Sequence, residues 1–216
     1  MLLSDISPKN PRLSMRQVNV KQGTDEWHQF RRTHLGASDA ISIMGMSPWK
    51  SPLGLYEDKI FNIDQEENEF MARGKRLEPI ALEAFEKETG LIMFPGVFVH
   101  DTIDWMSASF DGITLEQDAI CEIKCPGKKD HAIALKGKIP TKYIPQLQHQ
   151  IYVSGLSFSY YYSFDGESGV VIEVKRDQEF IDKMVEKEFE FWNCLMSLTP
   201  PKYEINKNEY ATATPI

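Results

Sequence analysis

Closely spaced runs of β-forming residues between positions 92 and 124 constrain the fold of this chain more than any other feature. Short runs rich in branched and aromatic side chains, separated by turn residues, are typical of strands. The predicted strands span residues 92–99, 105–109, 112–115 and 119–124, with a turn at Glu116, Gln117 and Asp118 before the last. Because short connections join antiparallel neighbours, the pattern predicts an antiparallel meander.

Helical signals lie on both sides of this meander. Thr24 is a predicted N-cap, and Pro52 after Ser51 is typical of the first turn of a helix. The predicted helices span residues 24–34, a short segment after Ser38, 51–60, a longer region that ends near Gly90, 129–136, 140–153 and 178–198. Two more strands are predicted over 157–164 and 170–175. We therefore expect an α/β fold in which a central mixed, mainly antiparallel β-sheet is flanked by helices.

Pro79 lies inside the long helical region that ends near Gly90. Proline removes a backbone donor and disfavours helical geometry for the residue before it, so we expect either a kink or a fresh helix start here. After the proline, apolar residues recur at helical spacing and should face the core. They are Ile80, Ala81, Ala84 and Phe85, and Glu78 should lie near the edge of this buried face.

The length of 216 residues and the hydrophobic fraction of 42% suffice for one domain with a sizeable core. We expect a single domain over residues 16–199, a flexible segment over 1–15 and a loose tail over 200–216. No apolar run reaches the roughly 18 to 20 residues that cross a bilayer, and residues 1–14 lack the apolar core of a secretory signal. An intracellular protein without a membrane partner is expected.

The three cysteines are Cys121, Cys125 and Cys194. They cannot all pair within one chain, and no Cys-x-x-Cys or His pair provides a zinc-binding pattern. A reducing cytoplasm is therefore expected. Cys121, Ile123 and Cys125 alternate along the sequence, which predicts that their side chains lie on the buried face of a strand.

The net charge of −8 is unfavourable for a protein that binds nucleic acid, because phosphate contacts require a positive surface. The positive charges are nevertheless clustered, while the acidic excess lies over 64–69 and 177–190. The basic residues are Lys124, Lys128, Lys129, Lys136, Lys138 and Lys142, with a second group of Arg73, Lys75 and Arg76. Two interpretations stay open: a basic groove on an acidic body, or an ordinary solvated surface.

Two carboxylates and one lysine are predicted to converge at one end of the sheet. Asp111 is followed eleven residues later by Glu122, and Lys124 follows two residues after that. Glu122 and Lys124 project from the same face of a strand, while Ile123 points to the other face. A hairpin turn between Asp111 and Glu122 brings the first carboxylate beside the other two groups.

This grouping suits phosphodiester hydrolysis. Magnesium prefers oxygen ligands, which Asp111, Glu122 and the Ile123 carbonyl can supply, and it lowers the pKa of a bound water. Lys124 can orient the attacking water or stabilise developing negative charge. Glu78 is the candidate third carboxylate for a two-metal site. The competing interpretation is that Glu-x-Lys forms only an exposed ion pair and that Asp-Gly is only a turn.

Four segments, in order, resemble the phage lambda exonuclease family, also described as YqaJ-like viral recombinase nucleases of the PD-(D/E)XK superfamily. The resemblance covers about residues 16–198 and implies a restriction-endonuclease-like core. The segments are residues 22–31 with 36–39, which match the N-terminal signature; 73–78, which match the helix of the early glutamate; 108–112 with 122–126, which match the active-site core; and 143–148, which match a helical motif beyond it.

The resemblance implies a role for each matching residue. Asp111 and Glu122 would bind metal with Glu78, Lys124 would serve the nucleophilic water, and Gln146 would lie at the active site. Arg31 and Ser38 would contact the terminal 5′-phosphate of the digested strand. Independently of the family, a guanidinium suits phosphate, and a serine at a helix N-terminus presents hydroxyl and backbone donors to an anion. The ordinary alternatives are a surface salt bridge for Arg31 and simple N-capping for Ser38.

The family implies a processive 5′-to-3′ exonuclease that degrades one strand of linear double-stranded DNA from its end and releases 5′-mononucleotides. It also implies two Mg²⁺ ions, with Mn²⁺ as a substitute, and a ring-shaped homotrimer around DNA. Recombination with a single-strand annealing partner and a location in the cytoplasm of a bacterial host, encoded by a phage or prophage, follow from the same resemblance.

Two departures from the family pattern bear on these roles. The usual Pro-Asp is Phe110-Asp111 here, and Pro79 directly follows Glu78, which places the metal role of Glu78 in question. His28 and His149 are expected to be packed or solvent-exposed rather than ligands. The alternative functions are a RecB-like or restriction-type endodeoxyribonuclease and a catalytically silent protein that binds DNA ends.

Overall fold

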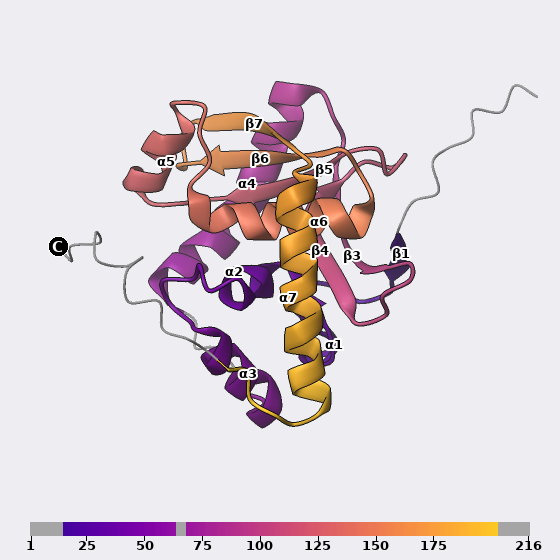
Figure 1. Ribbon diagram of the computed structural model, residues 1–216. Helices are drawn as coiled ribbons and strands as arrows, with labels where there is room; N and C mark the ends of the chain where they lie inside the picture. Colours follow the sequence, from indigo (N-terminus) through magenta and orange to yellow (C-terminus); the bar gives the residue numbers. More distant parts are fainter. Residues whose placement is uncertain (1–14, 64–67, 203–216) are drawn as a thin grey trace, which may run out of the picture.

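The computed structural model describes residues 15–63 and 68–202. The predicted flexible segment therefore lies outside the described residues except for Met15, as does the predicted tail beyond residue 202. Within the described part of the chain, seven strands form one sheet in the order β1-β3-β4-β5-β6-β7, with β2 beside β4 (Figure 1). Their bounds are β1 Met15–Val18, β2 Leu35–Gly36, β3 Phe94–His100, β4 Met106–Ile113, β5 Ile120–Lys124, β6 Phe158–Phe164 and β7 Gly169–Lys175.

The predicted antiparallel meander is confirmed by strands β3, β4 and β5, each of which pairs antiparallel with the next. The chain then crosses over, so that β6 runs parallel to β5 before β7 returns antiparallel. The sheet is thus mixed and mainly antiparallel, as predicted. Strands β1 and β2 were not predicted, because segments of four and two residues are too short to carry a period-two pattern.

The sequence prediction was wrong about Phe110 and Asp111, which lie inside the single strand β4 rather than between two strands. Gly112 is needed there for close packing, because a Cβ atom would lie 2.7 Å from the Cys121 Sγ and 2.8 Å from the Met93 Cβ. The turn lies farther along, at the predicted residues, where Gln117 has a φ of 56°. The Thr114 hydroxyl accepts the Asp118 and Ala119 amides in that turn, each at 3.1 Å.

Helices cover both faces of the sheet (Figure 1). Helix α4 packs on the face of Cys121 and Ile123, whose side chains are buried as predicted, while α6 and α7 cover the opposite face. The helix bounds are α1 Asp25–Arg32, η1 Ala37–Asp39, α2 Ala40–Ile43, α3 Pro52–Phe61, α4 Glu69–Thr89, α5 Lys128–Ala134, η2 Thr141–Tyr143, α6 Ile144–Ser154 and α7 Gln178–Met196.

Helix α4 runs unbroken past Pro79, so the expectation of a fresh helix start is wrong. Ala81 and Phe85 are fully buried, but Ile80 is 52% exposed, contrary to the prediction that it faces the core. One helical residue turns the side chain by about 100°, which carries Ile80 off the line of Ala81 and Phe85. The Gly90 left-handed cap ends the helix where predicted.

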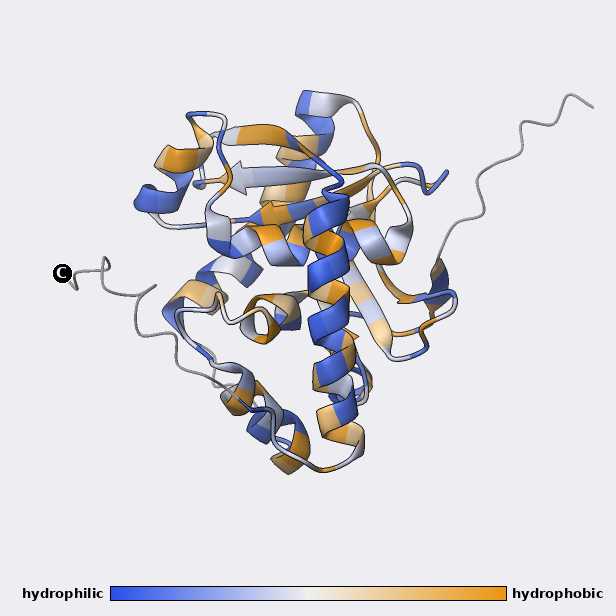
Figure 2. Ribbon diagram, viewed as in Figure 1, coloured by the Kyte–Doolittle hydropathy of each residue, from blue (hydrophilic) through white to orange (hydrophobic). Residues whose placement is uncertain are grey.

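Helix α7 runs nearly vertically through the middle of the view in Figure 1, and its outward face is largely hydrophilic in Figure 2. Its inward positions, among them Ile181 and Met184, are fully buried against α6 and the sheet. No helix in the described ranges 15–63 and 68–202 is long and apolar enough to cross a membrane.

Candidate active site

Asp111, Glu122 and Lys124 meet at adjoining positions of β4 and β5, as the spacing predicted. The Asp111 Oδ2 accepts the Ile123 amide at 2.8 Å, which fixes the first carboxylate against the neighbouring strand. The Lys124 Nζ donates to the Glu122 Oε1 at 2.5 Å. Glu122 is only 2% exposed, so the interpretation of this pair as an exposed surface ion pair is wrong.

Helix α6 supplies two amides to the Glu122 carboxylate. The Gln146 Nε2 donates to Oε1 at 2.6 Å, and the Gln150 Nε2 donates to Oε2 at 2.5 Å. Residues four apart lie on the same helix face, so the two glutamines reach one carboxylate together. Gln146 was predicted at the site. Gln150 was missed, although its spacing from Gln146 was a signal that could have identified it.

The pKa values of two carboxyl groups show that acidic groups are crowded here. Burial raises the pKa of Asp111 well above its usual range, and Glu122 and Glu78 raise it further, against the opposing effect of Lys124. Burial and the Glu122 charge likewise raise the pKa of Glu78. Glu78 is therefore close enough to share the electrostatic field of Asp111 and Glu122 despite Pro79.

Lys124 is held in its charged form by the same carboxylates. Burial alone would lower the pKa of Lys124, but Glu122 and Asp111 outweigh it, and the net pKa lies above the usual value. One ammonium group thus faces three acidic groups. The site thus holds three carboxyl groups and one ammonium group, and a divalent cation bound there would favour the charged forms of the carboxyl groups.

The donor set fits magnesium rather than a softer metal, because it consists of carboxylate and carbonyl oxygens. The described residues contain no cluster of three His, Cys, Asp or Glu side chains already arranged around one point. The Glu122 Oε1 already accepts from Lys124 and Gln146, so metal binding at this oxygen would require one of these two contacts to loosen, while Gln150 holds the other oxygen, Oε2, in place. The metal roles of Asp111, Glu122, Glu78 and the Ile123 carbonyl remain predictions.

Arg31 and Ser38, the predicted phosphate-binding pair, are in contact. The Arg31 Nη2 donates to the Ser38 Oγ at 2.8 Å, and both side chains reach solvent. Helix α2 begins after Ser38, as predicted, but Ser38 lies within η1 and the N-cap of α2 is Asp39, so the alternative of simple N-capping by Ser38 is wrong. The pair therefore presents a guanidinium group and a neighbouring hydroxyl group that could bind an anion.

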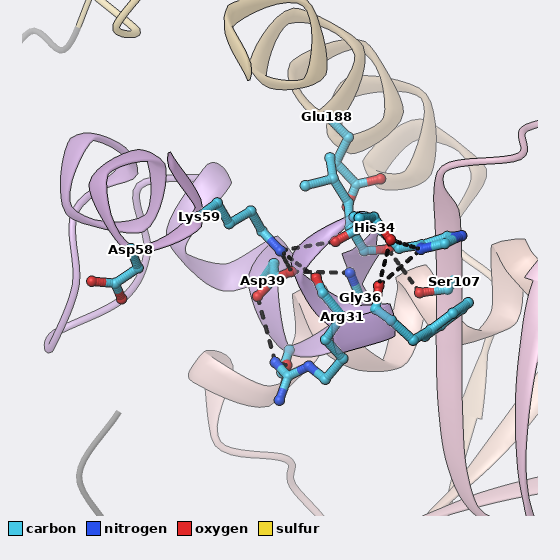
Figure 3. Close-up of polar contacts among 12 residues, drawn as sticks. Arg31, His34, Gly36, Asp39, Asp58, Lys59, Ser107 and Glu188 are labelled. Atoms are coloured by element: carbon cyan, nitrogen blue, oxygen red, sulfur yellow. Dashed lines mark hydrogen bonds and ion pairs between the residues drawn. The ribbon is translucent and has the colours of Figure 1, made fainter. Parts of the chain in front are cut away.

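The buried carboxylate of Asp39 holds Arg31 in place through an ion pair. Asp39 lies between Arg31 and Lys59 (Figure 3), with its Oδ2 2.9 Å from the Lys59 Nζ and its Oδ1 3.7 Å from the Arg31 Nη2. Burial alone would raise the pKa of Asp39, but Lys59 and Arg31 hold it below its usual value. The cluster carries one net positive charge, which leaves it suited to an anion.

Helix α1, which carries Arg31, is anchored beside the strand that carries Asp111. The Trp27 Nε1 donates to the Ser109 Oγ at 3.0 Å, and the Gln22 Nε2 donates to the Phe110 carbonyl at 3.2 Å. The Arg31 guanidinium lies 4.8 Å from the centroid of the Trp27 ring. The two predicted subsites therefore lie on neighbouring, mutually braced elements.

The predicted basic groups are partly used within the protein. Arg73 donates to the carbonyls of Cys125, Pro126 and Asp165, and thereby fastens α4 to the loops after β5 and β6. Lys142 pairs with Asp130 at 2.6 Å. His149 is fully buried and hydrogen-bonded, which agrees with the expectation that it is packed.

Replacement of Gln150 by alanine is expected to raise the Mg²⁺ concentration required for half-maximal nuclease activity. Glu122 would lose a charge-assisted hydrogen bond. We expect kcat/KM at limiting Mg²⁺ to fall by about 10- to 100-fold as a result. Activity of both proteins is measured across a Mg²⁺ titration, with urea unfolding as a check on stability. An unchanged Mg²⁺ titration in a stably folded variant would show that Gln150 does not position Glu122.

Comparison with known proteins identifies related sequences. A family model described as the YqaJ-like viral recombinase domain matches residues 26–157. YqaJ of Bacillus subtilis is 31% identical over 182 residues, which are 81% of this chain and 57% of that protein. Protein D345L of African swine fever virus is 26% identical over 169 residues, 64% of this chain and 46% of that protein. The chain spans about half the length of these curated relatives.

Solved structures agree with the fold. An alkaline exonuclease, LHK-Exo, from Laribacter hongkongensis superposes with a TM-score of 0.71 at 29% identity, covering 81% of this chain and 94% of that chain. A complex of LHK-Exo with dAMP gives the same TM-score. A phage-related exonuclease from Haemophilus somnus shares the fold, with a TM-score of 0.55 at 14% identity over 80% of this chain and 99% of that chain. The predicted fold class is confirmed.

Proposed function

The chain belongs to the YqaJ-like viral recombinase family, and from this membership we propose that it is a Mg²⁺-dependent exonuclease that degrades one strand of linear double-stranded DNA in the 5′-to-3′ direction. The observation that carries the proposal is the convergence of Asp111, Glu122 and Lys124 at one point of the sheet. The exonuclease activity of LHK-Exo, a protein of similar fold and 29% identity, supports the reaction class.

The residues divide the chemistry among them. Asp111 and Glu122, with Glu78 and the Ile123 carbonyl, would hold the metal, which when bound polarises the phosphate and lowers the pKa of a coordinated water. Gln146 and Gln150 hold the Glu122 carboxylate in one orientation. The Lys124 ammonium is charged and rigidly placed, and would hydrogen-bond the attacking water or the developing negative charge on phosphorus oxygens.

Several broader expectations belong to the same proposal. Residues 16–199 would form one nuclease domain, two metal ions would bind, and Mn²⁺ would substitute for Mg²⁺. The protein would form a homotrimer around DNA and work with a single-strand annealing protein in phage-type recombination in the bacterial cytoplasm. A ring would place the basic groups toward the DNA and leave the acidic excess outside.

The Arg31 pair gives the sharpest test of polarity. Digestion of end-labelled linear duplex is expected to be faster with a 5′-phosphate than with a 5′-hydroxyl, and to release mononucleotides. Arg31→Ala should reduce that preference by about 10- to 100-fold, because it removes charge-assisted hydrogen bonds to the phosphate. The matched control is Arg16→Ala, which removes an exposed arginine paired with Asp104.

The outcomes separate the competing functions. Equal rates on phosphate and hydroxyl ends in the wild type would contradict the role of Arg31 and Ser38. Efficient cutting of closed circular DNA would support the restriction-type or RecB-like endonuclease instead. Binding to ends without Mg²⁺-dependent turnover would support a catalytically silent protein.

A further inference from the structure

Trp49 is the most conspicuous aromatic side chain on the loop between α2 and α3, and it is 69% exposed. The loop holds it in a fixed position. The Ser47 Oγ accepts the amides of Trp49 and Lys50 at 3.2 and 3.1 Å, and the Ser51 Oγ caps α3 immediately afterwards. An indole that is exposed to solvent and held by an ordered loop does not pack in the core, and such a side chain is typical of a binding site.

Alternating aromatic rings and ammonium groups connect Trp49 to the candidate active site. The Lys142 Nζ lies 5.0 Å from the centroid of the Trp49 ring and 5.1 Å from that of Tyr143. The Lys124 Nζ lies 5.4 Å from the centroid of the same Tyr143 ring. Asp130 fixes the far end of Lys142 through an ion pair and lies 3.4 Å from the Tyr143 hydroxyl. A continuous series of side-chain contacts therefore connects the exposed indole to Lys124, and the ion pair with Asp130 holds Lys142 within it.

We propose that Trp49, with Lys142 behind it, is a stacking platform for a nucleobase of the DNA next to the phosphodiester bond held at Lys124. Exposed aromatic rings interleaved with cations are how proteins bind nucleic-acid strands without reading their sequence. The ammonium group on one side of the indole leaves the exposed remainder of the ring for a base. The proposal rests on the proposed nuclease function and adds a binding subsite to it.

The chemistry favours a base over another protein surface. The Lys142 ammonium lies against the Trp49 ring, and a cation at this position favours polyanionic DNA over the apolar surface that a stable contact between copies would bury. It also lies on the path to the group that would receive the scissile phosphate. A second copy of this chain is the alternative occupant that the experiment must separate.

The test combines substitution of Trp49 with removal of a single base from the DNA. The kcat/KM for release of the first nucleotide is measured with 5′-phosphorylated duplexes that carry one abasic site, scanned through the first few positions from the end. In the wild type, one abasic position should lower kcat/KM by about 5- to 150-fold, the effect of losing one stacked base. In Trp49→Ala the intact duplex should show the same loss, and the abasic duplex no further loss.

Conservative variants and a matched control sharpen the result. Trp49→Tyr should retain most of the activity because it can still stack, whereas Trp49→Leu should resemble Trp49→Ala. Phe61→Ala removes another aromatic ring, which is 68% exposed, and should leave both duplexes at wild-type rates. Light scattering should give the same mass for Trp49→Ala and the wild type.

Three results would overturn the platform. In the first, every abasic position lowers the kcat/KM of Trp49→Ala by the same factor as it lowers the kcat/KM of the wild type. In the second, Trp49→Leu is as active as Trp49→Tyr. In the third, Trp49→Ala changes the mass of the assembly, which assigns the indole to a contact between copies. Failure of the proposed function is a separate result, in which the wild type hydrolyses no linear duplex at all.

Discussion

Replacement of Lys124 by alanine is expected to lower kcat for DNA hydrolysis by about 10²- to 10⁴-fold. The ammonium group directly contacts the Glu122 carboxylate, and it lies beside the strand that carries Asp111. Without it, nothing in that position can orient the water or stabilise charge in the transition state. Single-turnover digestion of 5′-phosphorylated duplex at saturating Mg²⁺ measures the effect.

The control for this prediction is Lys136→Ala, which removes an exposed lysine of the same basic stretch. DNA binding and thermal stability should be retained in Lys124→Ala, since removal of a cation from a metal site does not remove the metal ligands. Activity within a few-fold of the wild type in Lys124→Ala would show that the catalytic site lies elsewhere.

Replacement of His149 by leucine is expected to lower the free energy of unfolding by about 3–5 kcal/mol. His149 and Glu188 are fully buried, with the His149 Nδ1 2.8 Å from the Glu188 Oε1 and the Nε2 2.9 Å from the Ser107 carbonyl oxygen. Both ring nitrogens face acceptors, so the imidazole is held as the cation. The Glu188 Oε2 already finds no hydrogen-bond partner among the described residues. Loss of His149 would leave a buried, unpaired carboxylate.

The double variant His149→Leu with Glu188→Leu should regain much of this stability, because it removes the unpaired charge as well. Urea unfolding at neutral pH measures all three proteins. If the double variant were no more stable than His149→Leu, lost packing rather than the buried charge would be responsible.

The same pair predicts how stability depends on pH. Burial alone would lower the pKa of His149, but Glu188, the Ser107 carbonyl and Asp39 raise it above the usual value. A raised pKa in the folded state gives a contribution that is complete below about pH 6.5 and disappears as the pH rises through the folded-state value. The wild type should therefore lose this contribution above about pH 6.5, and Glu188→Leu should lack that loss.

Elements with local signals could be predicted from the amino-acid sequence alone. Thr24 and Ser51 cap their helices as predicted, and Gly90 ends α4, because capping depends on a few neighbouring backbone groups. Side chains alternate between the two faces of a strand, so the sequence of residues 121–125 alone places Glu122 and Lys124 on one face of the sheet and Cys121 and Ile123 on the other. The hairpin turn brings Asp111 to them, since a turn fixes which residues face each other.

Contacts between residues distant in the sequence depend on the tertiary structure. Only packing shows that Gly112 serves close contact with Cys121 and Met93 rather than a turn. Gln150 contacts Glu122, and Trp49 approaches Lys142, because the chain crosses over between β5 and β6.

Asp111, Glu122 and Lys124 could thus be predicted from local spacing, because a strand and a hairpin position them. The carboxamides around Glu122, the buried His149–Glu188 pair and the support of Arg31 by Asp39 and Lys59 could not. Each joins elements whose distance apart in the sequence says nothing about their distance in space. Burial then sets the charge states of these groups, and burial is a property of the folded molecule alone.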